Sequence, residues 1–196
     1  MFQAARAVTN RPAWRIIVLT AMNATNTISD GSRQQFVMLL EQHRRMVFKV
    51  ASTYARAPDR EDLAQEIAAQ LWRAFPAYDA SRPFSTWLYR IALNVGISHL
   101  RGHAARERRT VPLELELHEA ADQHAPEPGA DEAPRMLGEF IAQLDALNRA
   151  LLLLYLDEHS TREIAEILGI TESNVTTKIN RLKERVRRFG ETHGTR

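Results

Sequence analysis

The sequence contains no cysteine, and this absence removes several functions at once. A chain without thiols forms no disulfide, no thiolate zinc site and no cysteine nucleophile, and it is compatible with a reducing cytoplasm. Its seven histidines are scattered, and we interpret them as ordinary residues rather than metal ligands. The sequence also lacks a glycine-rich phosphate loop, a nucleophile motif and a carboxylate constellation. We therefore expect no metal, no cofactor and no catalytic residue.

Apolar runs long enough to span a bilayer are also missing. The segment from Trp14 to Met22, WRIIVLTAM, follows two arginines and contains a third, Arg15, so that it superficially resembles a secretory leader, but it is far too short for a membrane helix. We predict that residues 1–32 form an extension without packed structure. Met22 begins a more natural polar lead, which favours an artefact of start-site choice, and whether residues 1–21 belong to the native protein stays open.

Charge is segregated along the chain although the net charge is only +2. Residues 101–109 hold four arginines and one glutamate, and residues 110–134 hold seven acids and no lysine or arginine. Residues 178–196 then hold seven basic residues and two glutamates. Two basic blocks on either side of an acidic one predict two places where a polyanion binds, with an intervening segment that repels it.

The hydrophobic pattern is helical from Gln34 onward, without strands or repeats. One apolar stripe predicts a single helix ending before Pro58 (Phe36, Leu40, His43, Val47, Val50, Tyr54), with His43 packed in the core. Asp59 is predicted to cap a second helix that ends at Pro76, and a third helix runs from about Ser85 past Arg101. Helical periodicity resumes at Met136, and the very apolar segment around Leu151 predicts the central helix of a small bundle.

These patterns predict an all-α fold of two small helical domains. We expect domains at residues 33–109 and 135–190, an acidic flexible linker at 110–134 that is punctuated by prolines, and a tail at 191–196.

The segment STREIAEILGITESNVTTKINRLKERVRR indicates a helix-turn-helix. Ser160 and Glu163 form a capping box, Gly169 ends the first helix and Thr171 caps the second. The second helix buries a stripe at spacings of four and three residues (Val175, Ile179, Leu182, Val186, Phe189). Its other side carries short polar side chains near its start and a basic cluster later, which suit base edges and phosphates in duplex DNA.

The first domain separates the candidate functions. Its segments APDREDLAQEIAAQLWRAF and SRPFSTWLYRIALN resemble regions 2.2 to 2.4 of bacterial sigma-70-type factors of the extracytoplasmic-function group, and the carboxyl-terminal domain resembles region 4 of that group. The resemblance extends from about Gln34 to Arg188, in the family's order and with its linker length. It implies a subunit that binds core RNA polymerase and directs promoter recognition, DNA melting and transcription initiation for a specific regulon.

The resemblance implies roles for three groups of residues. Docking on the clamp helices of the largest polymerase subunit falls to Asp62, Gln65, Glu66 and Trp72. The resemblance implies that a second group opens and captures the −10 element: Phe84, Thr86, Trp87, Tyr89, Arg90, Asn94 and Arg101. Further phosphate contacts are implied for Arg106, Arg108 and Arg109. Trp87 and Tyr89 are alternatively core residues. Contact with the −35 element falls to Thr176, Thr177, Lys178, Asn180, Arg181 and Arg185.

Three positions depart from the family's pattern. Thr176 stands where a basic residue is usual, Lys178 where arginine is usual, and Ser98 where aspartate is frequent. These departures put the promoter sequence in doubt rather than the function.

The expected partners are core RNA polymerase, including its flap, promoter DNA and an anti-sigma factor, in the bacterial cytoplasm and without membrane insertion. The alternative is a stand-alone helix-turn-helix regulator with a helical sensor domain. An enzyme is a distant third hypothesis, because no motif suggests a substrate.

Overall fold

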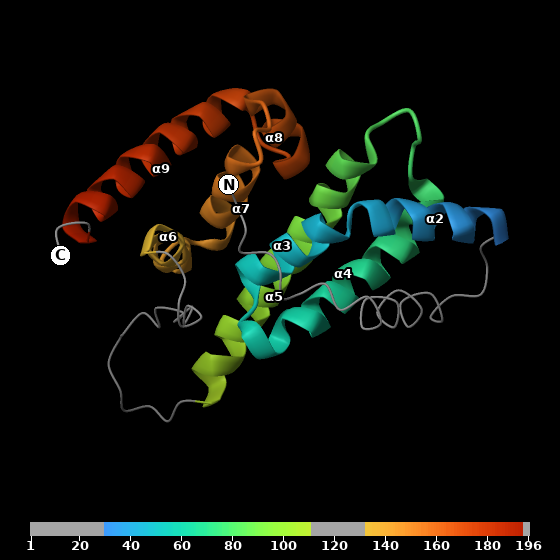
Figure 1. The fold of residues 1–196 in the computed structure, drawn as a ribbon, viewed down its shortest axis with the longest axis horizontal. Coiled ribbons are helices and arrows are strands. Elements are labelled where there is room, and N and C mark those ends of the chain that lie inside the picture. The colour runs from blue at the N-terminus through green and yellow to red at the C-terminus, as the bar shows by residue number, and fades with distance from the viewer. Residues whose placement is uncertain (1–29, 111–131, 194–196) are drawn as a thin grey trace. The chain divides into compact units, whose positions relative to one another are not determined.

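The computed structural model describes residues 30–110 and 132–193, and these ranges consist of helices joined by short turns, with no strand (Figure 1). This confirms the all-α prediction. The chain divides into two compact units, residues 1–102 and 103–196. The predicted extension and most of the predicted acidic linker lie outside the described residues. So do the side chains of Arg106, Arg108 and Arg109.

The first unit begins with two helices where one continuous helix was predicted. A single residue separates helix α2 (Asp30–Gln42) from helix α3 (Arg44–Tyr54). The intervening His43 has φ −106° and ψ 11°, outside the helical region, and its Nδ1 lies 2.8 Å from the carbonyl oxygen of Leu39. The backbone N–H of His43 also lies 3.2 Å from the carbonyl oxygens of both Leu39 and Leu40, so one donor is shared between the α-helical and the 3₁₀ acceptor where the helix is interrupted. The half-buried His43 ring packs against Phe84 at 5.1 Å between centroids.

A short 3₁₀ turn, η1 (Ala57–Asp59), leads into α4 (Arg60–Ala74). The predicted cap by Asp59 is wrong, because Asp59 has a helical backbone within this turn and its side chain makes no cap hydrogen bond. A second 3₁₀ turn, η2 (Phe75–Ala77), and a loop then connect to the long helix α5 (Phe84–Thr110). Helix α4 packs alongside α3, as Figure 1 shows.

The core of this unit is filled by fully buried side chains from every helix, among them Phe36, Val50, Leu63, Ile67 and Leu88. Gly96 of α5 lies against the ring of Tyr54 on α3. A β-carbon built on Gly96 would lie 2.7 Å from Cδ2 of the Tyr54 ring, which is closer than van der Waals contact allows. Only glycine therefore leaves room for this ring.

The second unit contains α6 (Glu132–Ala142), α7 (Ala146–Leu156), α8 (Thr161–Leu168) and α9 (Glu172–His193). Helix α7 is buried from Arg149 to Leu154 and contacts both α8 and α9, as expected of the central helix. Its last turn differs from that expectation, because Tyr155 and Leu156 are 40% and 49% exposed.

We expect Gly96→Ala to lower the free energy of unfolding of the first unit by about 1–3 kcal/mol, the usual cost of overpacking, because the gain in helix propensity is smaller than the cost of the clash with Tyr54. Trp72 and Trp87 belong to the first unit and residues 103–196 contain no tryptophan, so tryptophan fluorescence during urea unfolding measures this change. Gly31→Ala in the first turn of α2 is the matched control, because its β-carbon would meet no atom within 4 Å. Equal stability of the two variants would contradict the packing argument.

Candidate nucleic-acid and protein interfaces

The start of α8 and the turn between α8 and α9 are each fixed by local hydrogen bonds. The Glu163 backbone N–H donates to Oγ of Ser160 at 3.2 Å, and the Ser160 N–H donates to the Glu163 carboxylate at 2.8 Å. These bonds complete the predicted capping box, and hydrogen bonds from Ser160 also hold the pKa of the Glu163 carboxyl below its ordinary value. Gly169 ends α8 at φ +67°, in the left-handed region, and Thr171 accepts a hydrogen bond from the N–H of Asn174 at 3.3 Å.

This turn presents the amino-terminal half of α9 to solvent. Val175, Ile179 and Leu182 are buried, whereas Thr176, Thr177, Asn180 and Arg181 are exposed and Lys178 is half-exposed. The hydroxyls of Thr176 and Thr177 donate to helix carbonyls four residues earlier, at 3.0 and 2.9 Å. Their methyl groups and remaining lone pairs, together with the Asn180 amide and the Arg181 guanidinium, are groups that contact base edges in a major groove.

The later basic cluster of α9 is less available than its sequence indicates. Glu184 accepts hydrogen bonds from Arg187 at 2.8 Å and from Arg188 at 3.1 Å, and Arg187 also pairs with Glu191 at 3.1 Å. The bonds from Arg187 and Arg188 lower the pKa of Glu184, and Glu184 in turn raises the pKa of Arg187. Both arginines must exchange these partners before they can contact phosphate.

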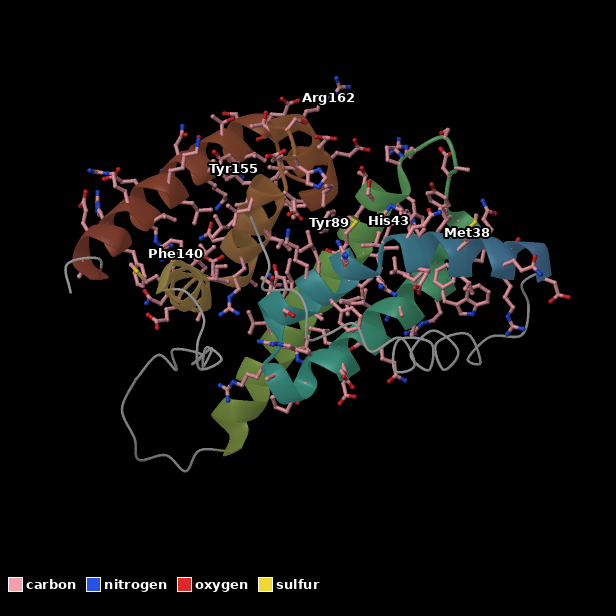
Figure 2. The ribbon with its side chains drawn as sticks, in the orientation of Figure 1. Met38, His43, Tyr89, Phe140, Tyr155 and Arg162 are labelled. Carbon is pink, nitrogen blue, oxygen red and sulfur yellow. The ribbon has the colours of Figure 1, made fainter. Side chains whose placement is uncertain are left out.

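Two other cations of α9 lie over aromatic rings of the same unit. The Lys183 ammonium lies 4.8 Å from the centre of the Tyr155 ring on α7, and the Arg185 guanidinium lies 5.9 Å from that of Phe140 on α6 (Figure 2). Cations over rings at these distances are attracted by the ring quadrupole. Arg185, which the sequence assigned to the −35 element, therefore has a defined support while it stays exposed.

Arg149 is a feature of the second unit that sequence reasoning missed. It is 4% exposed, and its Nε and Nη2 donate to the carbonyls of Leu144 and Ala142 at 2.9 and 2.8 Å. The guanidinium thus satisfies carbonyls at the end of α6, where the helix dipole favours a cation. A single arginine inside the apolar run LNRALLLLYL was the signal that could have indicated it, because a buried charge needs partners.

Helix α4 of the first unit carries an acidic face. Asp62 and Glu66 are exposed one turn apart, and Gln65 beside them is half-buried. Trp72, which the sequence placed with them, is only 1% exposed and packs on Phe36 at 5.0 Å between ring centroids. Its predicted direct contact with a partner is corrected to a core position, because this side chain offers no surface.

A cluster of aromatic rings surrounds the start of α5. Phe84 and Tyr89 are 5% and 2% exposed, so the structure makes them core residues rather than direct DNA contacts. Trp87 stays half-buried, with its ring 5.2 Å from that of Phe84 and 5.1 Å from that of Tyr78. Figure 2 labels the buried Tyr89 on α5.

The sequence analysis did not identify Tyr78, because it lies in a loop without periodicity. Its hydroxyl donates to the carbonyl of Arg82 at 2.8 Å and closes the loop before α5. In the same loop Asp79 accepts a hydrogen bond from the N–H of Ser81 at 2.9 Å, and Ser81 holds the pKa of the Asp79 carboxyl below its ordinary value. Tyr78 of this loop thereby packs against the ring of Trp87, which stays half-buried.

Polar and cationic residues continue from Trp87 along one face of α5. Arg90, Asn94 and Arg101 are exposed and follow Trp87 at helical spacing, and the half-buried Thr86 lies beside them. An aromatic ring followed by a cationic stripe is an arrangement that holds single-stranded nucleic acid by stacking and by phosphate contacts.

No cluster of three or more His, Asp or Glu side chains that could hold a metal ion occurs within residues 30–110 and 132–193. Across the same described ranges, no helix combines the length and the apolar character needed to cross a membrane.

Comparison with protein families assigns both units. Residues 39–106 match the model of sigma-70 region 2, and residues 135–186 match that of sigma-70 region 4. The extracytoplasmic-function (ECF) RNA polymerase sigma factor SigW of Bacillus subtilis (strain 168) is 29% identical over 171 residues, which cover 82% of this chain and 91% of SigW. The ECF sigma-E factor of Escherichia coli (strain K12) is 25% identical over 177 residues, which cover 86% of this chain and 93% of sigma-E.

Two solved structures share the fold. The sigma factor RpoE of Bartonella quintana, solved with the anti-sigma factor NepR, has a TM-score of 0.63 at 16% identity and covers 84% of this chain and 99% of its own. CnrH, solved with the cytosolic domain of CnrY, has a TM-score of 0.58 at 20% identity and covers 92% of this chain and 99% of its own. Because both region models match in the family's order and the relatives align over most of their length, the chain belongs to the extracytoplasmic-function group of the sigma-70 family.

Proposed function

We propose that this sigma factor directs transcription initiation by dividing promoter recognition between its two units. The exposed acidic face of α4 binds core RNA polymerase, the Trp87 face of α5 opens and holds the −10 element, and the exposed start of α9 binds the −35 element. One observation carries the proposal: a helix-turn-helix with a polar, cationic face occurs in one chain with a unit that has separate acidic and aromatic-cationic faces.

The division explains why neither unit needs to bind tightly alone. Two weak sites held at a fixed separation gain specificity through effective concentration, and the polymerase fixes that separation. The free protein should therefore bind duplex DNA weakly and with strong salt dependence. We infer that the protein acts in the cytoplasm, has no catalytic residue of its own and is restrained by an anti-sigma factor, as suggested by the complex of RpoE with NepR.

The stand-alone regulator is the weaker hypothesis. It accounts for the helix-turn-helix but gives no reason for the region 2 match over residues 39–106. Run-off transcription with purified core polymerase on genomic fragments, beginning with the promoter of its own gene, tests the proposal directly. Tight promoter binding without core polymerase would contradict the mechanism.

We expect Glu66→Lys to weaken binding to core polymerase by at least about tenfold, because it reverses an exposed charge on the proposed docking face. Fluorescence anisotropy of the labelled protein titrated with core polymerase measures the effect. Glu41→Lys is the matched control, because it makes the same charge reversal at an exposed glutamate that lies on α2, outside the proposed docking face. Equal losses in the two variants would mean that overall charge, rather than this face, determines binding.

We expect Trp87→Ala to reduce initiation from a duplex promoter by about tenfold or more, the scale of one lost base-stacking contact. On a template whose −10 region is unpaired beforehand, most of the activity should return, because the cost of melting has been removed. Transcript yield on the two templates gives the comparison. A similar loss on both templates would indicate that Trp87 supports the fold rather than DNA opening.

We expect Glu184→Gln to strengthen binding of the holoenzyme to its promoter and to steepen its salt dependence by about one unit of slope, because Arg188 loses its carboxylate partner and Arg187 keeps only its pairing with Glu191. Promoter binding over a series of salt concentrations measures the slope. Glu172→Gln makes the same charge change at the start of α9, away from both arginines, and serves as control. If the two variants had the same slope, release of the arginines would be excluded as the cause.

A further inference from the structure

The end of α6 is held by Arg149, the one buried charged residue among those the structure describes. Its guanidinium bonds to the carbonyl of Ala142, the last residue of α6, and to that of Leu144 in the turn that follows. Arginine presents its donors in a rigid planar fork, so two bonds to two different carbonyls fix the direction in which α6 ends. The position of α6 relative to α7 therefore depends on this side chain.

Phe140 lies in the last turn of α6, directly before the carbonyls that Arg149 binds. It is 3% exposed, and its ring meets that of Phe189 on α9 at 5.4 Å with an interplanar angle of 60°. The guanidinium of Arg185 lies over the same Phe140 ring at 5.9 Å. Figure 2 shows Phe140 on α6, which packs against α9. Any displacement of the end of α6 moves the ring that supports Arg185.

Arg185 belongs to a basic edge of α9 that it shares with Lys178 and Arg181. These residues follow at spacings of three and four and therefore lie along one side of the helix, next to its buried stripe. A long side chain held over a ring loses less rotamer freedom when it contacts phosphate than one that moves freely in solvent.

We propose that Arg149 is a positioning residue for DNA binding, which acts through the end of α6 and the Phe140 ring to hold Arg185 at the basic edge for a phosphate contact. The inference rests on the proposed function of α9. In this proposal a buried side chain that does not touch DNA determines part of the electrostatic interaction between the protein and the promoter.

The test measures the salt dependence of promoter binding by the holoenzyme for Arg149→Met, Arg185→Ala and the double variant. Each single variant should reduce the slope of log affinity against log salt by about one, the loss of one phosphate contact. The double variant should lose no more than either single one, because both remove the same contact. A purely structural role for Arg149 would instead lower thermal stability and leave the slope unchanged, which would overturn the proposal.

Phe140→Leu keeps the test decisive if Arg149→Met fails to fold. It retains an apolar side chain at the end of α6 and removes only the ring under Arg185, so the same loss of slope is expected. An unchanged slope in this variant would also overturn the proposal. If Arg185→Ala itself leaves the slope unchanged, the assignment of α9 to DNA fails. If Arg185→Ala lowers the slope but Phe140→Leu and Arg149→Met leave it unchanged, only the positioning role of Arg149 fails.

Discussion

Burial of the apolar stripe of α9 against α7 and α8 is the interaction on which the DNA-facing surface depends. Val175, Ile179 and Leu182 are at most 6% exposed, and their burial determines which side of α9 faces solvent. The capping box fixes the start of α8, and the left-handed Gly169 ends α8 and begins the turn into α9. The polar face of α9 is thus a consequence of core packing, because a helix that buries one stripe must expose the opposite one.

The same principle operates differently in the first unit, where aromatic rings form much of the core. Phe36, Trp72 and Phe84 are buried in the core. Trp87 lies at the edge of that cluster and is half-exposed. A ring that packs against other rings on one side has little rotamer freedom, so less conformational entropy is lost when a base stacks on its other side. In the proposed function, the buried aromatic residues therefore contribute to DNA binding indirectly, through the position of Trp87.

The availability of charge also differs from its distribution along the sequence. Residues 178–196 hold seven basic residues, yet Arg187 and Arg188 are paired with glutamates of the same helix, and Lys183 and Arg185 lie over rings. Counting charges predicted a polyanion site. The side-chain geometry divides that site into an edge that we propose to contact DNA directly and a later cluster whose arginines are paired with carboxylates.

Local patterns were sufficient for much of the fold. The all-α class, the helix-turn-helix and its capping box followed from the sequence, because periodicity, caps and glycine turns act over a few residues. They failed at His43, where the expected continuous helix is interrupted, and at Asp59, where a 3₁₀ turn takes the place of the expected cap. They failed also at Val186, which was predicted to be buried in the stripe of α9 and is 36% exposed. The site residues of α9 could be placed on an exposed face for the same local reason, since one apolar stripe identifies the opposite side.

Only the tertiary structure decided which side chains are buried in a helix whose apolar residues are not confined to one face. In α4 and α5 apolar and aromatic residues surround much of the helix, so spacing alone could not distinguish the buried Trp72 and Tyr89 from the half-exposed Trp87. Nor could it show that Arg149 bonds to carbonyls at the end of a different helix. By itself the sequence determined the helical class, the helix-turn-helix and the two-region order, because these depend on neighbouring residues; burial and long-range hydrogen bonds depend on partners that meet only after folding.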